Sequence, residues 1–174
     1  MSASLTVPLS EYLETIYRPD CDYIDGEVLK RNLGEREHAV LQGILARIFG
    51  NHRKEWGVIT LLEQRVQVSA KNYRVADLCV VEATAPRDRI VQKPPLVAIE
   101  ILSRRDSLQS IRKRGNDYLK MGVQNFWVFD PVDRWALICT NSGLIEPENS
   151  ELSVPGTSIK LVLADIFAEL AEIV

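Results

Sequence analysis

Two short, almost uninterrupted apolar runs constrain the fold more than any other feature of this sequence. They are VADLCVV at 75–81 and LVAIEIL at 96–102. Continuous apolar runs of this length are typical of strands that are covered on both faces. The sequence therefore predicts a sheet with other elements packed on its two sides.

The rest of the chain supplies helices and further strands. Apolar residues recur at helical spacing in 35–51 and 107–121, and a terminal helix is expected at about 163–171. The other expected elements are a short helix at 9–16, a hairpin at 21–32, and strands at 58–62, 65–68, 125–129, 136–140 and 143–146. This order predicts an α/β or α+β fold with a mixed β-sheet flanked by α-helices. Because no repeat or linker interrupts the sequence, a single domain is expected over 1–174.

Composition excludes several classes of protein. The chain has 21 Lys and Arg against 24 Asp and Glu, a net charge of −3, and 46% hydrophobic residues, as in an ordinary globular protein. No apolar run approaches the roughly 20 residues of a membrane helix, and the first 20 residues lack the pattern of a signal peptide. No GxSxG, Walker or GxGxxG motif is present. We therefore expect a cytoplasmic protein with no membrane partner and no small-molecule cofactor.

Each of the two apolar runs contains one carboxylate, Asp77 in the first and Glu100 in the second. An ionised carboxylate in a dry interior is costly unless it is paired, hydrogen-bonded or bound to a metal. If the two strands end at the same place, the pair could hold a hard divalent cation through its oxygens. Alternatively, each carboxylate is salt-bridged to an arginine or lies at a strand end in solvent.

The segment after Glu100 is the most basic in the chain. Between 104 and 120 it has six Lys and Arg against two Asp, a local net charge of +4. A positive helix beside a metal-binding carboxylate pair suits a phosphodiester substrate, because the cations attract the backbone and a metal generates the attacking hydroxide. A solvated helix face would explain the same charges.

Weaker candidates lie elsewhere in the chain. His38 stands at the start of the first long helix, where a histidine is more often a packing or capping residue than a ligand. Glu27 follows an Asp-Gly turn and could close the site from another direction, or be plain turn chemistry. Tyr118 shares a helical stripe with Arg114, four residues earlier.

Several motifs in order resemble those of a known family. They are IDGE at 24–27, His38 opening a helix, Asp77 in its apolar run, EILSRRDSL at 100–108, RKRGNDYLKMGV at 112–123 and FWVFDP at 126–131. Together they resemble the Uma-type family of restriction endonucleases over roughly 9–170. That family belongs to the restriction-endonuclease-like superfamily, PD-(D/E)XK, so the resemblance implies that fold.

The resemblance also implies a nuclease site that uses Mg²⁺ or Mn²⁺. Asp77 occupies the place of the family's first metal carboxylate and Glu100 that of the second, with the backbone carbonyl of Ile101 as an extra ligand. The superfamily's lysine two residues after the Glu is replaced by Leu102. The lysine that family members commonly carry on the following helix is replaced by Arg114, with Lys113 beside it.

We therefore expect a Mg²⁺-dependent endonuclease that hydrolyses DNA phosphodiester bonds. Asp77 and Glu100 would hold the metal. Lys113 or Arg114 would orient the attacking water or steady the charge of the transition state, although arginine stays charged and cannot act as a base. The expected accessory residues are Glu27, His38 and Tyr118, and the expected nucleic-acid-binding residues are Arg104, Arg105 and Arg112. A homodimer is expected by analogy with related nucleases, because two sites are needed to cut both strands.

Two alternatives remain open from the sequence. In one, the chain is a non-catalytic nucleic-acid-binding or protein-binding module that retains the nuclease fold. In the other, the two carboxylates are merely ion-paired, which predicts a large loss of stability when either is removed and no binding of metal.

Overall fold

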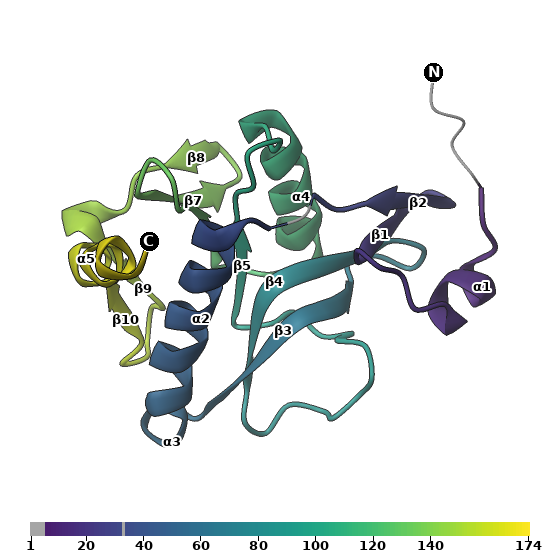
Figure 1. Cartoon of the computed structure of the whole chain (residues 1–174). Coiled ribbons are helices and arrows are strands. Elements are labelled where there is room, and N and C mark those ends of the chain that lie inside the picture. Colours follow the sequence, from purple (N-terminus) through teal and green to yellow (C-terminus); the bar gives the residue numbers. More distant parts are fainter. Residues whose placement is uncertain (1–5, 33) are drawn as a thin grey trace.

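A mixed β-sheet of eight strands runs through the centre of the molecule (Figure 1). The computed structural model describes residues 6–32 and 34–174. Seven strands follow the order β2-β1-β4-β5-β6-β7-β8, and β3 pairs with β4 off this path. Only the β5–β6 pair is parallel; the other pairs in this sheet are antiparallel. The strands are β1 Cys21–Ile24, β2 Glu27–Lys30, β3 Val58–Gln67, β4 Tyr73–Glu82, β5 Val97–Ile101, β6 Phe126–Asp130, β7 Trp135–Thr140 and β8 Gly143–Ile145.

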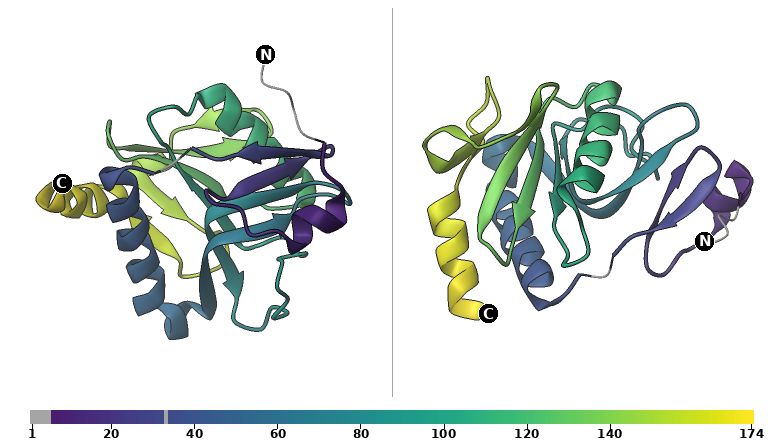
Figure 2. Two further views of the ribbon diagram at one scale, coloured as in Figure 1. Left: turned by 45° about the vertical axis from the view of Figure 1, so that its right-hand side comes forward. Right: turned by 90° about the horizontal axis from the view of Figure 1, so that it is seen from above.

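Helices cover both faces of this sheet. They are α1 Leu9–Glu14, α2 Arg36–Asn51, α3 Arg53–Trp56, α4 Leu108–Met121 and α5 Leu163–Ile173. Apolar side chains of α2 and α5 share one core with Leu78, Ile99 and Trp127, whereas α4 forms a second core with Cys79 and Phe126 on the opposite face. Figure 2 shows this layering, with α1 and the β1–β2 hairpin at the end of the molecule away from α5.

The fold class predicted from the sequence is confirmed, because the apolar runs are neighbouring strands between helical layers. Two details differ. The strands expected at 58–62 and 65–68 form one strand, β3, which continues through Glu63 despite a φ of 47° there. A two-stranded sheet of β9 Glu151–Ser153 and β10 Lys160–Val162, preceded by a 3₁₀ turn at Glu148–Ser150, was not predicted. In the part of the chain that the structure describes, no helix is long and apolar enough to cross a membrane.

Candidate active site

A gap in the pairing of β4 creates the polar centre of this molecule. On one side β4 pairs with β3 along its length. On the other side it pairs with β1 only at Tyr73 and with β5 only through Leu78–Val80. The intervening residues, 74–77, therefore face side chains instead of a strand on that side. The amide of Val75 donates to Asp22 Oδ1 at 2.9 Å, and its carbonyl accepts from the Arg31 guanidinium.

The two carboxylates singled out in the sequence meet at this gap. Asp77 precedes Leu78 and Glu100 follows Ile99, and Leu78 and Ile99 are register partners of the antiparallel β4–β5 pair. The amide of Ile101 donates to Asp77 Oδ2 at 2.6 Å, which fixes the Asp77 carboxylate against β5. Asp77 is 2% exposed and Glu100 is fully buried, so both must be neutralised by neighbouring groups.

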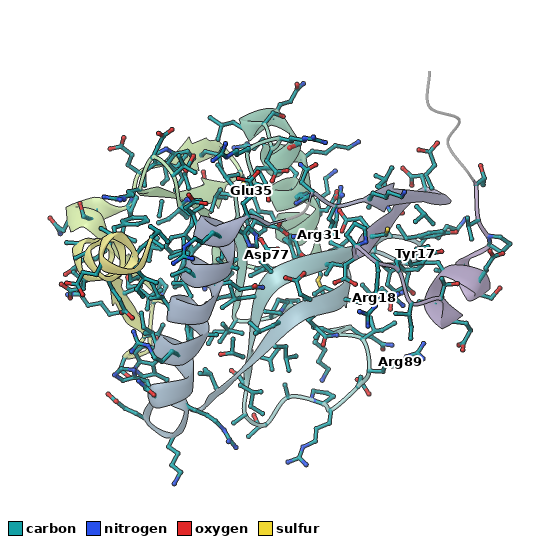
Figure 3. The ribbon with its side chains drawn as sticks, in the orientation of Figure 1. Tyr17, Arg18, Arg31, Glu35, Asp77 and Arg89 are labelled. Carbon is teal, nitrogen blue, oxygen red and sulfur yellow. The ribbon has the colours of Figure 1, made fainter. Side chains whose placement is uncertain are left out.

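The Arg31 guanidinium lies between these two carboxylates. Its Nη2 donates to Asp77 Oδ1 and lies 3.2 Å from Glu100 Oε2, and its Nη1 lies 3.3 Å from Glu100 Oε1. In Figure 3, Arg31 and Asp77 lie close together between α2 and β4. A single forked cation therefore spans both carboxylates from the segment that follows β2.

A second arginine approaches Glu100 from α4. Nη1 of Arg114 donates to Glu100 Oε2 at 2.8 Å, and its Nε lies 3.6 Å from Asp22 Oδ2. Asp22 also accepts from Arg74 at 2.7 Å, and Arg74 in turn binds Asp117 of α4 at 2.6 Å. Acids and arginines thus alternate through a largely buried network that ties α4 to β1, β4 and β5.

The start of α2 adds a third set of groups. His38 Nε2 lies 3.5 Å from Asp77 Oδ2, and Gln42 donates to the Asp77 carbonyl at 3.0 Å. Gln42 also donates to the Glu63 carboxylate at 2.7 Å, and Glu63 stands opposite Asp77 between the register pairs 62–78 and 64–76 of β3 and β4. Glu63 has the left-handed backbone conformation that non-glycine residues rarely adopt, so its place beside the site is held against local strain.

Burial and pairing act against each other on the ionisation of these groups. Burial opposes ionisation of Asp77, but Arg31 and His38 outweigh it and hold the pKa of Asp77 below its ordinary value. Burial dominates for Glu100 and raises its pKa, although Arg31 and Arg114 oppose the shift. Burial would lower the pKa of His38, but its contact with Asp77 raises it. The pKa of Arg31 is raised well above its ordinary value, because Glu100 and Asp77 outweigh its burial.

The structure brings together part of the predicted site. Asp77, Glu100 and Arg114 meet as described, with His38 and the Ile101 amide against Asp77. Tyr118 is fully buried and stacks on Phe126, and burial together with nearby Glu100 raises the pKa of its phenol far above the ordinary value. Among the described residues its hydroxyl has no hydrogen-bond partner.

Other predicted residues lie outside this cluster. Lys113 is exposed and forms no ion pair with any described residue, because it follows a different face of α4 from Arg114. Glu27 lies on β2 opposite Ile24, and its carboxylate likewise has no ion pair within the described chain. Arg104 pairs with Glu35 at 2.7 Å. Arg112 donates to the carbonyl of Asn141 at 3.0 Å, and Arg105 is exposed.

Sequence reasoning missed Arg31, Asp22, Gln42 and Glu63. Arg31 lies in a polar segment with no periodic pattern, and only the folded chain brings it to Asp77. Asp22 had a detectable signal, since it is an acid within the apolar strand sequence CDYI of β1. The alternative in which arginine pairs with both carboxylates did anticipate the kind of contact, without naming the residue.

The donor set of this cluster fits a divalent cation. Nη2 of the Arg31 guanidinium contacts one oxygen of each carboxylate, so a cation at that position would be shared by Asp77 and Glu100. Hard cations such as Mg²⁺ bind through one or two carboxylates and complete their coordination with water and substrate phosphates. Across residues 6–32 and 34–174, no group of three or more His, Cys, Asp or Glu side chains forms a metal site, so other ligands would have to complete it.

A cavity of about 550 Å³ lies apart from this cluster. It is bounded by the loop at 83–96 and by residues of β3 and β4, among them Leu61 and Val81. Neither carboxylate nor either arginine of the cluster lines it. The candidate site is therefore identified by its buried charges and not by this cavity.

The mixed sheet flanked by helices and the buried acidic pair agree with the restriction-endonuclease-like class that the sequence motifs indicate. Residues 9–166 match the model of the Uma2 family, which is described as "Putative restriction endonuclease". This protein belongs to that family, and the resemblance seen in the sequence is confirmed. Among curated proteins, none matches the chain significantly.

Solved structures show the same fold. The crystal structure of a protein from Anabaena variabilis ATCC 29413, described as "a putative nuclease belonging to DUF820", matches with a TM-score of 0.80 and 23% identity. The match covers 94% of this chain and 99% of that chain. A DrdV–DNA complex matches with a TM-score of 0.45 and 13% identity, over 80% of this chain and 12% of that chain, a likeness too weak to support an argument.

Proposed function

We propose that this protein is a metal-dependent endonuclease that hydrolyses DNA phosphodiester bonds. The observation that carries the proposal is the position of Arg31 Nη2, one nitrogen of the cationic guanidinium, which donates to Asp77 and lies 3.2 Å from Glu100. Membership of a family described as "Putative restriction endonuclease" supports the same reaction.

In this proposal Asp77, Glu100 and the backbone carbonyl of Ile101 would hold Mg²⁺ or Mn²⁺. When bound, such an ion supplies Lewis-acid activation of the phosphate and of a water molecule. The chain holds Asp77 ready for this role through the Ile101 amide at 2.6 Å and the nearby His38 imidazole. Both contacts favour the ionised carboxylate, which is the form that binds metal.

Arg114 is proposed to stabilise negative charge on the reacting phosphate. Its guanidinium is anchored on Glu100 at 2.8 Å, and 13% of its side chain is exposed, so it borders both the acidic pair and the surface. Because arginine remains protonated, it neutralises charge and does not remove a proton. Lys113, on an exposed face of the same helix, is proposed to contact the substrate instead. Tyr118, which is buried on the same helix, and Glu27, which lies on β2, are proposed as accessory residues.

DNA is proposed to approach along the basic segment that follows Glu100. Arg104 and Arg105 precede α4, and Arg112 lies on it. Arg104 and Arg105 are exposed and can neutralise backbone phosphates. Assembly into a homodimer would supply the second site that is needed to cut both strands.

A cleavage assay tests this function. Supercoiled and linear DNA are incubated with wild type, Asp77→Asn or Glu100→Gln in Mg²⁺, Mn²⁺ or EDTA, with Glu82→Gln as a control that makes the same charge change at the exposed end of β4. We expect nicking that requires metal. The rate of nicking should fall by about 100-fold or more in both site variants, because a bound metal stabilises the transition state by several kcal/mol. Cleavage that survives both substitutions, or none by wild type with either metal, would contradict the proposal.

One observation favours the alternative of a non-catalytic binding module. All four carboxylate oxygens of Asp77 and Glu100 already accept from or face nitrogen groups of the chain. The pair is therefore satisfied without metal. Salt-sensitive DNA binding of equal strength in EDTA and Mg²⁺, without cleavage, would identify such a module.

A further inference from the structure

We infer that Arg31 is the resident cation of the Asp77–Glu100 pair and that a divalent metal enters only in exchange for the Arg31 guanidinium. Arg31 would then set the metal affinity of the site. This inference rests on the proposed function, because it describes how metal loading of the same site is controlled.

The contacts of Arg31 are the first step in the argument. The guanidinium donates to the Val75 carbonyl and to Asp77 Oδ1, and it lies 3.2 and 3.3 Å from the two oxygens of Glu100. A planar fork is suited to such multiple acceptors, and a metal shared by both carboxylates would need the volume that Nη2 fills. The two cations therefore exclude each other.

The charge balance is the second step. Asp77 and Glu100 carry two negative charges, which Arg31 and Arg114 neutralise. Adding a divalent ion without exchange would leave a net charge of +2 in a place where the Asp77 and Glu100 side chains are 2% and 1% exposed. Exchange of the ion for Arg31 would leave a net charge of +1. The smaller charge is favoured, because an uncompensated buried charge costs free energy. Electrostatics thus favours exchange over simple addition.

The position of Arg31 on the chain is the third step. Arg31 directly follows β2, and its backbone amide donates to the carbonyl of Asp20 at 3.1 Å. The backbone is therefore anchored, while the long side chain, 8% exposed, reaches the pair from the edge of the sheet. In the proposed exchange this side chain rotates away from the position between the carboxylates.

Calorimetric titration with Mn²⁺ or Mg²⁺ in the absence of DNA tests the exchange. Metal-free wild type is compared with Arg31→Gln and with Arg87→Gln, a control that removes the same charge from an exposed residue of the loop between β4 and β5. We expect Arg31→Gln to bind metal at least about tenfold more tightly than wild type, a difference of about 1.4 kcal/mol. Arg87→Gln should bind as wild type does. Adding Glu100→Gln to Arg31→Gln should abolish the gain, which places the metal at this pair.

A second variant covers the case in which Arg31→Gln does not fold. Arg31→Lys keeps the charge but cannot bind both carboxylates with one planar fork, so a smaller gain in the same direction is expected. Circular dichroism shows which of the two variants is folded. If a folded variant binds metal with an affinity within about twofold of that of wild type, the inference is overturned.

The outcomes separate this inference from the proposed function. Tighter metal binding by Arg31→Gln, with no DNA cleavage by any variant, would support the exchange and contradict the nuclease. Metal-dependent cleavage by wild type, with no gain in affinity in Arg31→Gln, would support the nuclease and overturn the exchange.

Discussion

At the scale of single residues, the buried cluster of Asp77, Arg31 and Glu100 is sensitive to the removal of any one of its charges. Removing one partner of a buried pair leaves the other charge uncompensated, which costs about 3–5 kcal/mol. Asp77→Ala would leave Arg31 facing Glu100 alone and would also remove the acceptor of the Ile101 amide. We expect the free energy of unfolding in EDTA to fall by about 3–5 kcal/mol, as measured by urea denaturation.

The control for this prediction is Glu82→Ala, at an exposed position, which should change stability by no more than about 0.5 kcal/mol. A loss below about 1 kcal/mol in Asp77→Ala would show that Arg31 is not paired with Asp77 in solution. A large loss is compatible with a metal site here. Arg31 contacts both carboxylates and so relieves the repulsion that would otherwise destabilise the metal-free pair.

The ionisation of His38 predicts a dependence of stability on pH. Its pKa in the folded protein is raised above about 6.5, the value expected when unfolded, by contact with Asp77. Protonation therefore adds stability that is fully present below about pH 6.5 and is lost as the pH rises through the folded pKa. We expect the stability difference between wild type and His38→Gln to be larger at about pH 6 than at about pH 9.

Urea denaturation at the two pH values measures this difference. His52→Gln, which removes the other histidine from a position outside the cluster, is the matched control for the loss of an imidazole. A difference for His38→Gln that is independent of pH would show that His38 does not gain a proton on folding.

At the scale of elements, the contact of α4 with the sheet controls the position of Arg114. Gly115 lies on the buried face of α4, and a Cβ there would come within 2.5 Å of Cys139 Sγ and 3.2 Å of Phe126. Gly115→Ala gains up to about 1 kcal/mol of helix propensity but must push α4 away from β6 and β7. We expect a net loss of about 1–3 kcal/mol in the free energy of unfolding, because overpacking of a core exceeds that gain.

Gly43→Ala provides the opposite control within α2. Among the described residues, no atom outside the backbone of α2 and the two chain neighbours lies within 4 Å of a Cβ at Gly43, so the same substitution should stabilise the protein by about 0.5–1 kcal/mol. Urea denaturation of both variants separates the effect of core packing on stability from the effect of helix propensity. Equal stabilisation by both would show that α4 is free to shift on the sheet.

The elements also show what could be predicted from the sequence and why. Strands β4 and β5 were predictable because their apolar runs are nearly continuous, and Asp77 and Glu100 were conspicuous because each is the one charged residue in its run. The strands β9 and β10 have three residues each, too few to establish a period. Arg31 was not predictable, because its place depends on the gap between β1 and β5 along β4, which is a property of the assembled sheet.

At the scale of the whole molecule, the net charge of −3 opposes general attraction to DNA. Any attraction must come from a local surface, and the segment at 104–120 with its net charge of +4 is the candidate. Not every cation in it is equally available. Arg114 is paired with Glu100, and Arg112 donates to the Asn141 carbonyl. By contrast, Arg105 is exposed, and Arg104 forms an exposed ion pair with Glu35.

The salt dependence of DNA affinity tests this assignment. Each phosphate contact contributes about 0.9 to the slope of log affinity against log salt concentration, because it releases condensed counterions. If Arg104 and Arg105 each contact one phosphate, the double substitution of both by Ala should reduce the slope by about 1.8, as measured by fluorescence anisotropy of labelled duplex DNA in EDTA. Arg87→Ala with Lys93→Ala makes the same charge change in the loop between β4 and β5 and should leave the slope unchanged. Equal reductions in the two double variants would mean that DNA responds to total charge and not to the surface beside Glu100, which would remove the proposed path of the substrate to the acidic pair.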